Sequence, residues 1–216
     1  MHLHGVNPRS IRDHRPKSDR STDTIGDLIV CPFTVIIDTR EQMPFSFMGM
    51  NIGKGQTRHP LLVKTTSMTL ESGDYSILGH SDKISIERKS LEDLYSTLTH
   101  GRERFERELT RLQEMQFSAV IVEASLETII SRPPPNTRVV PKSIYSSIIA
   151  YQQRYQRTHW VLCDSRRLAE KTAFRILERY WIDNIEKPAK DHSRQQRLEQ
   201  RNGVSVSHVN NGEQKD

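Results

Sequence analysis

Short runs of β-branched and other apolar residues constrain the fold of this chain more than any other feature. Runs at residues 33–38, 119–122 and 160–163 have the length and composition of buried strands. Residues 142–156 and 165–181, which follow the second and third runs, carry apolar side chains at helical spacing. Strands that alternate with helices in this way predict an α/β layered fold.

The first half of the chain adds a hairpin to this pattern. Residues 75–78 and 83–89 are predicted as two strands, and residues 79–82 (Gly-His-Ser-Asp) between them have the composition of a tight turn. Residues 61–68 form a further candidate strand, whereas residues 43–60, which contain three glycines and two prolines, are predicted as a loop. Because hairpin strands run antiparallel, we expect a mixed central sheet flanked by helices.

Two helices are predicted after the hairpin. Ser90 and Asp93 form a Ser-x-x-Asp pattern, which is typical of a helix start. Further along, Phe105, Leu109 and Leu112 are spaced by four and three residues, which places them on one face of a second helix. Its basic residues are either a solvated face paired with neighbouring glutamates or a phosphate contact. They are Arg102, Arg104, Arg107 and Arg111.

The two ends of the chain differ from its middle. Only 34% of the 216 residues are hydrophobic and 27% are charged, and the polar residues are concentrated at the ends. Residues 1–30 and 182–216 show no sustained apolar period and cannot bury enough apolar surface to offset the entropy of ordering. We therefore expect a flexible N-terminal tail over 1–30, one folded domain over 31–181 and a flexible polar C-terminal tail over 182–216.

Charge and cysteine content indicate which kind of partner and which cellular compartment suit the protein. The net charge of +5 is compatible with a polyanionic partner. Cys31 and Cys163 lie in apolar strand-like runs without metal-ligand spacing, which favours buried thiols in a reducing compartment. The chain shows neither an apolar run long enough for a membrane span nor a signal peptide. We expect a cytoplasmic or nucleoid/nuclear protein with no membrane association.

The tripeptide Glu87-Arg88-Lys89, together with Asp74, is the strongest chemical signal. Side chains two residues apart on a strand share a face, so Glu87 and Lys89 are expected on one side and Arg88 on the other. Asp74 would reach the same place from the preceding strand. Two carboxylates and an ammonium at one point are costly unless a divalent cation and a phosphate accompany them. The pattern predicts a metal-dependent enzyme acting on a phosphodiester.

Magnesium is the cation that these residues suit best. Mg²⁺ prefers oxygen ligands and is usually held by one or two carboxylates plus waters and substrate phosphate oxygens. Asp74 and Glu87 supply that chemistry, and Asp38, at the end of the first buried strand, would be a third carboxylate. Lys89 would act as a point charge, or help deprotonate water, where negative charge develops in the transition state.

The order of these residues resembles the nuclease domain of the XPF family of structure-specific endonucleases. The matching blocks are Val-Ile-Ile-Asp-Thr-Arg-Glu at 35–41, Gly-Asp-Tyr at 73–75, Glu-Arg-Lys-x-x-x-Asp at 87–93 and Gly-Arg at 101–102. Glu-Arg-Lys alone would be a weak signal, but four blocks in order at compatible spacing are strong. The resemblance extends over about residues 33–181.

This resemblance implies a restriction-endonuclease-like core that uses Mg²⁺, or Mn²⁺ as a substitute, to hydrolyse DNA near a branch, flap or junction, as in repair or recombination. It implies three metal-binding acids, Asp38, Asp74 and Glu87, and a catalytic lysine, Lys89. Phosphate-facing or nucleic-acid-binding roles would fall to Arg40, Arg88 and Arg102. Supporting roles would fall to Glu41 and Asp93.

Simpler interpretations of several of these residues stay open. Asp93 is explained equally well by capping of the helix that begins after Ser90. Arg88 could form an ion pair with Glu92 or Glu41 on the face away from the metal. The apolar face of residues 142–156 would be core, although in the XPF family this region helps nuclease domains to pair, as a homodimer or a heterodimer.

Two other functions compete with a flap endonuclease. One is a sequence-specific, restriction-like nuclease on the same scaffold, and the other is a non-catalytic DNA-binding subunit of a nuclease complex. XPF-family members commonly carry helix-hairpin-helix modules, and none is evident after residue 181, so the preferred junction is not predicted. The presence of every acid and of the lysine favours the catalytic alternative.

Overall fold

The structure is a computed structural model that describes residues 24–25, 28–53 and 58–207. Its strands are β1 (Thr24–Ile25), β2 (Leu28–Asp38), β3 (Asn51–Ile52), β4 (His59–Met68), β5 (Tyr75–Ile77), β6 (Ile84–Lys89), β7 (Phe117–Val122) and β8 (Thr158–Leu162). Its helices are α1 (Leu91–Thr97), α2 (Arg102–Leu112), α3 (Leu126–Ser131), α4 (Pro141–Arg154), α5 (Arg166–Trp181), η2 (Ile182–Glu186) and α6 (Lys187–Ser207).

The strands form one mixed sheet in the order β3-β4-β2-β5-β6-β7-β8, with β1 paired to β2. The pairs β2–β4, β6–β7 and β7–β8 are parallel, whereas β2–β5 and β5–β6 are antiparallel. The predicted α/β class and mixed sheet are therefore confirmed. The β5–β6 hairpin lies in the middle of the sheet, where β5 is antiparallel to both of its neighbours and β6 is parallel to β7.

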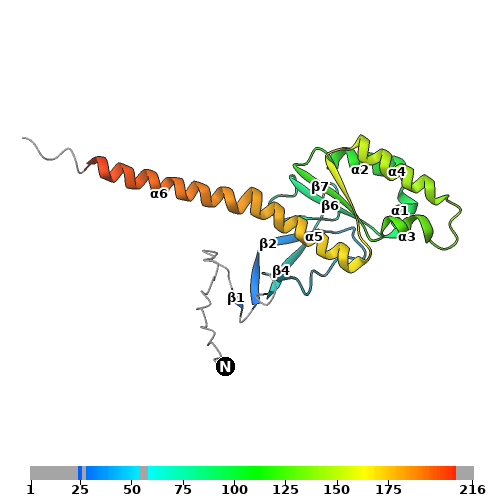
Figure 1. The fold of residues 1–216 in the computed structure, drawn as a ribbon, viewed down its shortest axis with the longest axis horizontal. Coiled ribbons are helices and arrows are strands. Elements are labelled where there is room, and N and C mark those ends of the chain that lie inside the picture. Colours follow the sequence, from blue (N-terminus) through cyan, green and yellow to red (C-terminus); the bar gives the residue numbers. More distant parts are fainter. Residues whose placement is uncertain (1–23, 26–27, 54–57, 208–216) are drawn as a thin grey trace, which may run out of the picture.

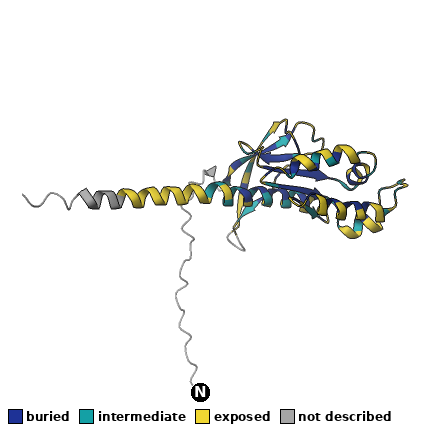
Figure 2. Cartoon of the chain, turned by 90° about the horizontal axis from the view of Figure 1, so that it is seen from above, coloured by how far each residue is buried: buried dark blue, intermediate teal, exposed yellow. Residues whose placement is uncertain are grey.

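Helices cover both faces of this sheet (Figure 1). Side chains of neighbouring β7 residues point to opposite faces, so Ile121 joins one core cluster while Val120 and Val122 join the other. The Ile121 cluster includes Phe174 of α5, and the second cluster is closed by α1, α2 and α4. Figure 2 shows the buried sheet between exposed outer helix faces.

Most of the predicted elements are present, with adjusted limits. Ser90 caps α1, since its hydroxyl accepts a hydrogen bond from the Asp93 N–H at 3.1 Å. Phe105, Leu109 and Leu112 are all buried on α2, as their spacing predicted. The predictions missed the short helix α3 and the two-residue strand β3 in the expected loop. β2 also begins before residue 31, so the strand extends into the segment predicted as a tail, whose residues 1–23 lie outside the described part.

The segment after residue 181 differs most from the prediction. It contributes no buried residue between 182 and 200, as its polar composition predicted, but it is helical to Ser207 rather than irregular. Ion pairs four residues apart join Lys187 to Asp183 and Lys190 to Glu186, both at 2.7 Å. Such pairs stabilise a solvated helix that has no packing partner.

Both cysteines are buried free thiols. None of the helices in the described residues combines the length and the apolar composition that a membrane crossing requires.

Candidate metal and phosphodiester site

Asp74 reaches the end of β6 through a sharp backbone turn at Gly73. Gly73 has φ +79°, and a Cβ there would lie 2.1 Å from the Ser85 Oγ. The Asp74 N–H donates to the carbonyl of Ile86 at 2.8 Å, and its own carbonyl accepts from the Asp38 N–H at 2.8 Å. Asp74 is thereby fixed between β2 and β6, where the Arg88 N–H donates to its carboxylate at 2.7 Å.

Glu87 and Lys89 point to the same side of β6 and form an ion pair, with the Lys89 Nζ donating to the Glu87 Oε1. Both side chains are buried, at 5% and 9% exposure. The Lys89 ammonium also lies 5.1 Å from the ring centroid of Phe105 on α2. The shared face of these two side chains is the arrangement that strand periodicity predicted.

The two acids share an electrostatic cost. Burial raises the pKa of Asp74 to about 7, despite opposing contributions from the Arg88 N–H and the Lys89 charge. Burial, followed by the charge of Asp74, raises the pKa of Glu87 well above its ordinary value. Burial would lower the pKa of Lys89, but the charges of Glu87 and its other acidic neighbours outweigh that effect and raise it. These neighbouring acids favour the ammonium form of Lys89.

Asp38 has a different set of partners from the Asp74–Glu87 pair. Its Oδ1 accepts from the backbone N–H and the Nε of Arg40, and its Oδ2 accepts from the Arg40 Nη2 and the Leu70 N–H, all within 2.6–3.0 Å. These four bonds use the four acceptor positions of a carboxylate. Burial alone would raise the pKa of Asp38, but these bonds outweigh it and lower the pKa.

Arg40 is held by Asp38 and still faces solvent. Its side chain is 65% exposed, and its Nη2 also donates to the carbonyl of Leu70 at 2.7 Å. In this structure the Asp38 carboxylate thus holds an exposed guanidinium in place. For Asp38 to bind a metal, as predicted, some of its hydrogen bonds to Arg40 or Leu70 would have to break. Arg40 has the exposure that a phosphate contact needs.

Arg88 points away from Glu87 and Lys89, into a buried ion-pair network. Its Nε lies 2.7 Å from Glu123 and its Nη1 3.2 Å from Glu41, and its side chain is only 8% exposed. The Arg88–Glu41 pair agrees with the simpler interpretation of Arg88, whereas the alternative partner Glu92 makes no such contact. Arg88 therefore joins β6 to β7 and to the segment after β2, and its burial argues against a DNA contact.

Arg102 and Asp93 are separate from the acid pair. Arg102, at the start of α2, donates to the Leu98 carbonyl at 2.9 Å and to the Ser147 Oγ at 2.8 Å, and thereby joins α2 to α4. Asp93 caps α1, and its carboxylate accepts from the Ser90 hydroxyl at 2.9 Å. Hydrogen bonds to Leu98 and Ser147 therefore account for the position of Arg102, and helix capping accounts for that of Asp93.

Glu108 on α2 is a site neighbour that the sequence prediction did not single out. It interacts electrostatically with Asp74, Glu87 and Lys89, and its Oε1 accepts from the Gly73 N–H at 3.4 Å. The charge of Glu41 also raises the pKa of Asp74. The signal for Glu108 was its place one residue before Leu109, on the side of α2 that faces the sheet.

The donor chemistry of this site fits a divalent cation held by two carboxylates. No group of three His, Cys, Asp or Glu side chains in the described residues is arranged as a complete metal cage. Mg²⁺ does not need one, because waters and substrate phosphates commonly complete its shell. Asp74 and Glu87 are half-buried and buried acids whose charges repel each other, and a cation between them would relieve that cost.

The fold is an α/β domain with a mixed central sheet, and the side chains of Asp74, Glu87 and Lys89 lie towards one end of β6. A family model described as the ERCC4 domain matches residues 37–173, which is more than half of the chain. The protein therefore belongs to the ERCC4 domain family. This family assignment agrees with the XPF resemblance that the sequence blocks indicated.

A solved structure supports the same fold. The chain is similar to XPF from Aeropyrum pernix, with a TM-score of 0.50 and 21% sequence identity, over 73% of this chain and 69% of that chain. At this identity the likeness concerns the fold alone. No curated protein matches the chain.

Proposed function

We propose that this protein is a divalent-metal-dependent DNA endonuclease that hydrolyses phosphodiester bonds in branched or flap DNA. The observation that carries the proposal is the burial of Asp74 and Glu87 beside the Lys89 cation at one end of β6. Membership of the ERCC4 domain family supports the same activity. Mg²⁺, with Mn²⁺ as a substitute, would be held by Asp74 and Glu87.

The roles of the side chains follow from their contacts. When bound, the metal would lower the pKa of a water and neutralise charge on a phosphoryl oxygen. Lys89 is a buried cation and would stabilise the negative charge that develops on the phosphate. Arg40, exposed and oriented by Asp38, would position the phosphate backbone. Arg88 and Arg102 would stabilise the fold around the site and would not contact DNA directly, because Arg88 pairs with Glu123 and Arg102 donates to Ser147.

Two rival functions make different predictions. A sequence-specific restriction-like nuclease would use the same acids but would cut plain duplex at a fixed sequence. A non-catalytic DNA-binding subunit would have no need of a buried lysine paired with a buried glutamate, since keeping that pair out of water is costly. The intact Asp74, Glu87 and Lys89 set favours an enzyme over this subunit.

A dimer is a further part of the proposal. Tyr145 and Ile149 lie one turn apart on the outer face of α4, and each is 37% exposed. The apolar face of residues 142–156 that the sequence predicted as core is buried through Ile144, Ile148 and Tyr151. Tyr145 and Ile149 are therefore the apolar residues of α4 available for pairing with a second nuclease domain.

A panel of substrates tests the proposed function. The full chain is incubated with a flap, a splayed arm and a plain duplex of matched sequence, with Mg²⁺ and with Mn²⁺. We expect metal-dependent cutting near the branch of the first two substrates and little cutting of the duplex. Equal cutting of the duplex at one fixed site would favour the restriction-like rival. No cutting of any substrate with either metal would contradict the proposal.

A further inference from the structure

A row of basic side chains runs along the outer surface of α5 and α6. On α5 its members are Lys171, Arg175 and Arg179, and on α6 they are Lys187, Lys190, Arg194 and Arg197. All of them are exposed. Within each helix the spacing is three or four residues, which places the side chains on one face. We call this set the basic row.

The π-helical turn η2 keeps the two halves of the basic row on the same face. Arg179 and Lys187 are eight residues apart, which in an unbroken α-helix would separate them by about 80° around the axis. In η2 the Lys187 N–H donates to the carbonyl of Ile182, five residues back, so the turn absorbs about one residue. The remaining rotation is about 20°.

Pro188 accounts for the position of this turn. Proline has no N–H, so in a regular helix the carbonyl of Asn184 would lose its partner and clash with the ring. A wider turn immediately before the proline accommodates this defect. The sequence therefore contains the residue that is needed to bring the α6 half of the row into line with the α5 half.

The ion pairs within the helices do not neutralise the row. Glu178 pairs with Arg175, Asp183 pairs with Arg179 and Lys187, and Glu186 pairs with Lys190, but surface ion pairs of this kind contribute about 0–1 kcal/mol. No ion pair joins Arg194 or Arg197 to an acid within the described residues. The row thus keeps a net positive charge, and its outer end is the least compensated part.

The dimensions of the row suit duplex DNA. From residue 171 to residue 197 the helix extends over about 39 Å, and at 3.4 Å per base pair that length corresponds to about 11 base pairs. Figure 1 shows α6 projecting away from the sheet, and Figure 2 shows it exposed along its described length. Leu198 is the one large apolar side chain exposed on the described part of α6. This part of the helix therefore offers little apolar surface for binding another protein.

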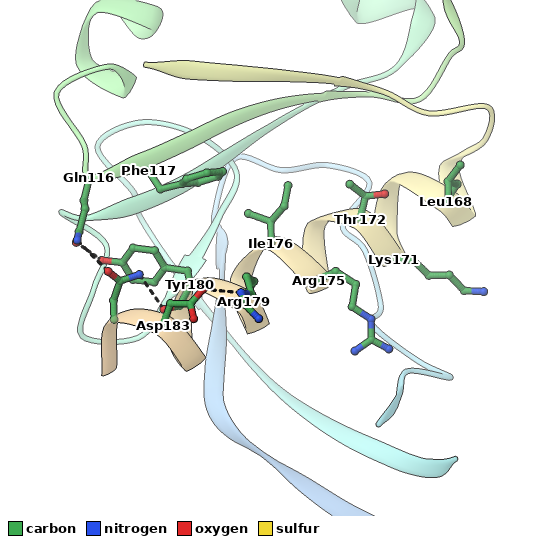
Figure 3. Close-up of a pocket in the computed structure, with 11 residues that line it drawn as sticks. Gln116, Phe117, Leu168, Lys171, Thr172, Arg175, Ile176, Arg179, Tyr180 and Asp183 are labelled. Atoms are coloured by element: carbon green, nitrogen blue, oxygen red, sulfur yellow. Dashed lines mark hydrogen bonds and ion pairs between the residues drawn. The ribbon is translucent and has the colours of Figure 1, made fainter. Parts of the chain in front are cut away.

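A nearby pocket borders the α5 half of the basic row, because Lys171, Arg175 and Arg179 are among its lining residues. The pocket has a volume of about 640 Å³ and is lined on its apolar side by Phe117, Leu168 and Ile176. Figure 3 shows Ile176 directed towards Phe117 of the sheet and Lys171 directed away from it, whereas the Arg175 Nη2 donates to the carbonyl of Asn51 on β3 at 2.6 Å. On α5 the cationic end of Lys171 therefore faces solvent, whereas that of Arg175 is also bonded to the backbone of β3.

We propose that the basic row on α5 and α6 binds the phosphate backbone of duplex DNA, as a contact separate from the Asp74–Glu87 site. This inference rests on the proposed function, because it assigns to the helix the duplex contact that an endonuclease of this kind needs. Lysine and arginine side chains that neutralise phosphates make DNA affinity steeply dependent on salt.

The test uses the full chain and a fluorescent duplex of about 24 base pairs, about twice the length that the row spans. Binding is measured without divalent metal at several salt concentrations, for the parent and for a Lys190→Gln/Arg194→Gln/Arg197→Gln variant. We expect the Kd to rise at least about tenfold, and the slope of log Kd against log salt to fall by about 2 to 3. Glutamine keeps the helix propensity, and circular dichroism checks that the helix content is unchanged.

Two matched variants make the result specific. Arg132→Gln/Arg138→Gln/Lys142→Gln removes the same charge from exposed positions around the loop between α3 and α4, and should change the Kd less than about twofold. Arg194→Lys/Arg197→Lys keeps the charge of the row and should bind like the parent. An unchanged Kd and salt slope in the α6 variant, or an equal loss in the control, would overturn the inference. A parent that binds through the row without cleaving would count against the proposed function alone.

Discussion

At the scale of single residues, the site brings together two carboxylates, those of Asp74 and Glu87, which repel each other unless a divalent cation lies between them. Asp74 and Glu87 are acids with raised pKa values, and the charge of Lys89 acts on both of them. A buried cation beside these acids suits the stabilisation of negative charge on a phosphate, which is the role proposed for Lys89.

Replacement of Lys89 by alanine should separate catalysis from binding. We expect the cleavage rate to fall about 100-fold or more, since a buried cation next to the reacting phosphate is lost. The Kd for DNA should change less than about twofold, because one lysine is a small part of a contact with many phosphates. Single-turnover cleavage and fluorescence anisotropy measure the two quantities. Lys83→Ala, at an exposed position just before β6, is the matched control, and equal losses of binding and cleavage in Lys89→Ala would show that Lys89 is a binding residue.

Asp74→Asn should stabilise the metal-free protein at pH 8. The folded-state pKa of Asp74 is about 7, above the ordinary value of 3.8, so the folded state holds an extra proton between these values. Asp74 therefore reduces stability as pH rises from about 4 to 7, and the reduction is complete above 7. Asparagine removes it and can still accept the Arg88 N–H.

Urea unfolding at pH 8 and at pH 4 measures this effect. We expect the variant to gain on the order of 1–2 kcal/mol at pH 8 and close to nothing at pH 4. Asp164→Asn, at an exposed position, should leave the free energy of unfolding unchanged at both values of pH. A gain of equal size at pH 4 would show that the charge of Asp74 is not its source.

At the scale of elements, the β5–β6 hairpin positions the acids of the site. The turn at Gly73, just before β5, places Asp74 beside β6. Gly73 and Gly79 both have positive φ, +79° and +83°, but only Gly73 has neighbours where a Cβ would lie. Gly79→Ala should therefore cost about 1–2 kcal/mol from backbone strain. Gly73→Ala should cost clearly more, about 3 kcal/mol or above, because the Ser85 side chain and the Ile86 carbonyl must also move. Chemical denaturation of the two variants compares them, and equal costs would contradict this account.

Much of this element structure is predictable from the sequence. The strand runs, the Ser90 cap and the α2 stripe are local signals, and each led to an element that the structure contains. The helix α6 was not predictable from apolar periodicity, because its described side chains are all exposed and its start is stabilised by ion pairs such as Lys187–Asp183. Local patterns describe packed elements better than solvated ones.

The site was predictable in part, for a physical reason. Glu87 and Lys89 share a face because strands have a period of two, so their juxtaposition follows from the sequence alone. The engagement of Asp38 with Arg40 and Leu70, and the approach of Glu108 from α2, depend on tertiary packing between distant segments. The apolar spacing of α2 places Glu108 near the side that faces the sheet, but no spacing in the sequence shows that it meets Gly73, or that Asp38 meets Leu70.

At the scale of the whole molecule, the packed domain and α6 are separable in energy. The described side chains of α6 are exposed, and neither core cluster includes one of its residues. We expect a chain that ends after Lys187 to keep a Tm within about 4 °C of the full chain, which corresponds to less than about 1 kcal/mol. Differential scanning calorimetry of the two proteins measures the difference. A drop of 10 °C or more would show that α6 supports the core in solution.

The most direct test of the central claim is the single-turnover cleavage of a flap substrate by the parent and by Glu87→Gln, with Mg²⁺ at saturating DNA. The account predicts that the variant binds the flap like the parent but cuts it at least about 100-fold more slowly, because one of the two acids proposed to hold the metal is lost. A Glu87→Gln protein that cuts within about twofold of the parent rate would contradict the account.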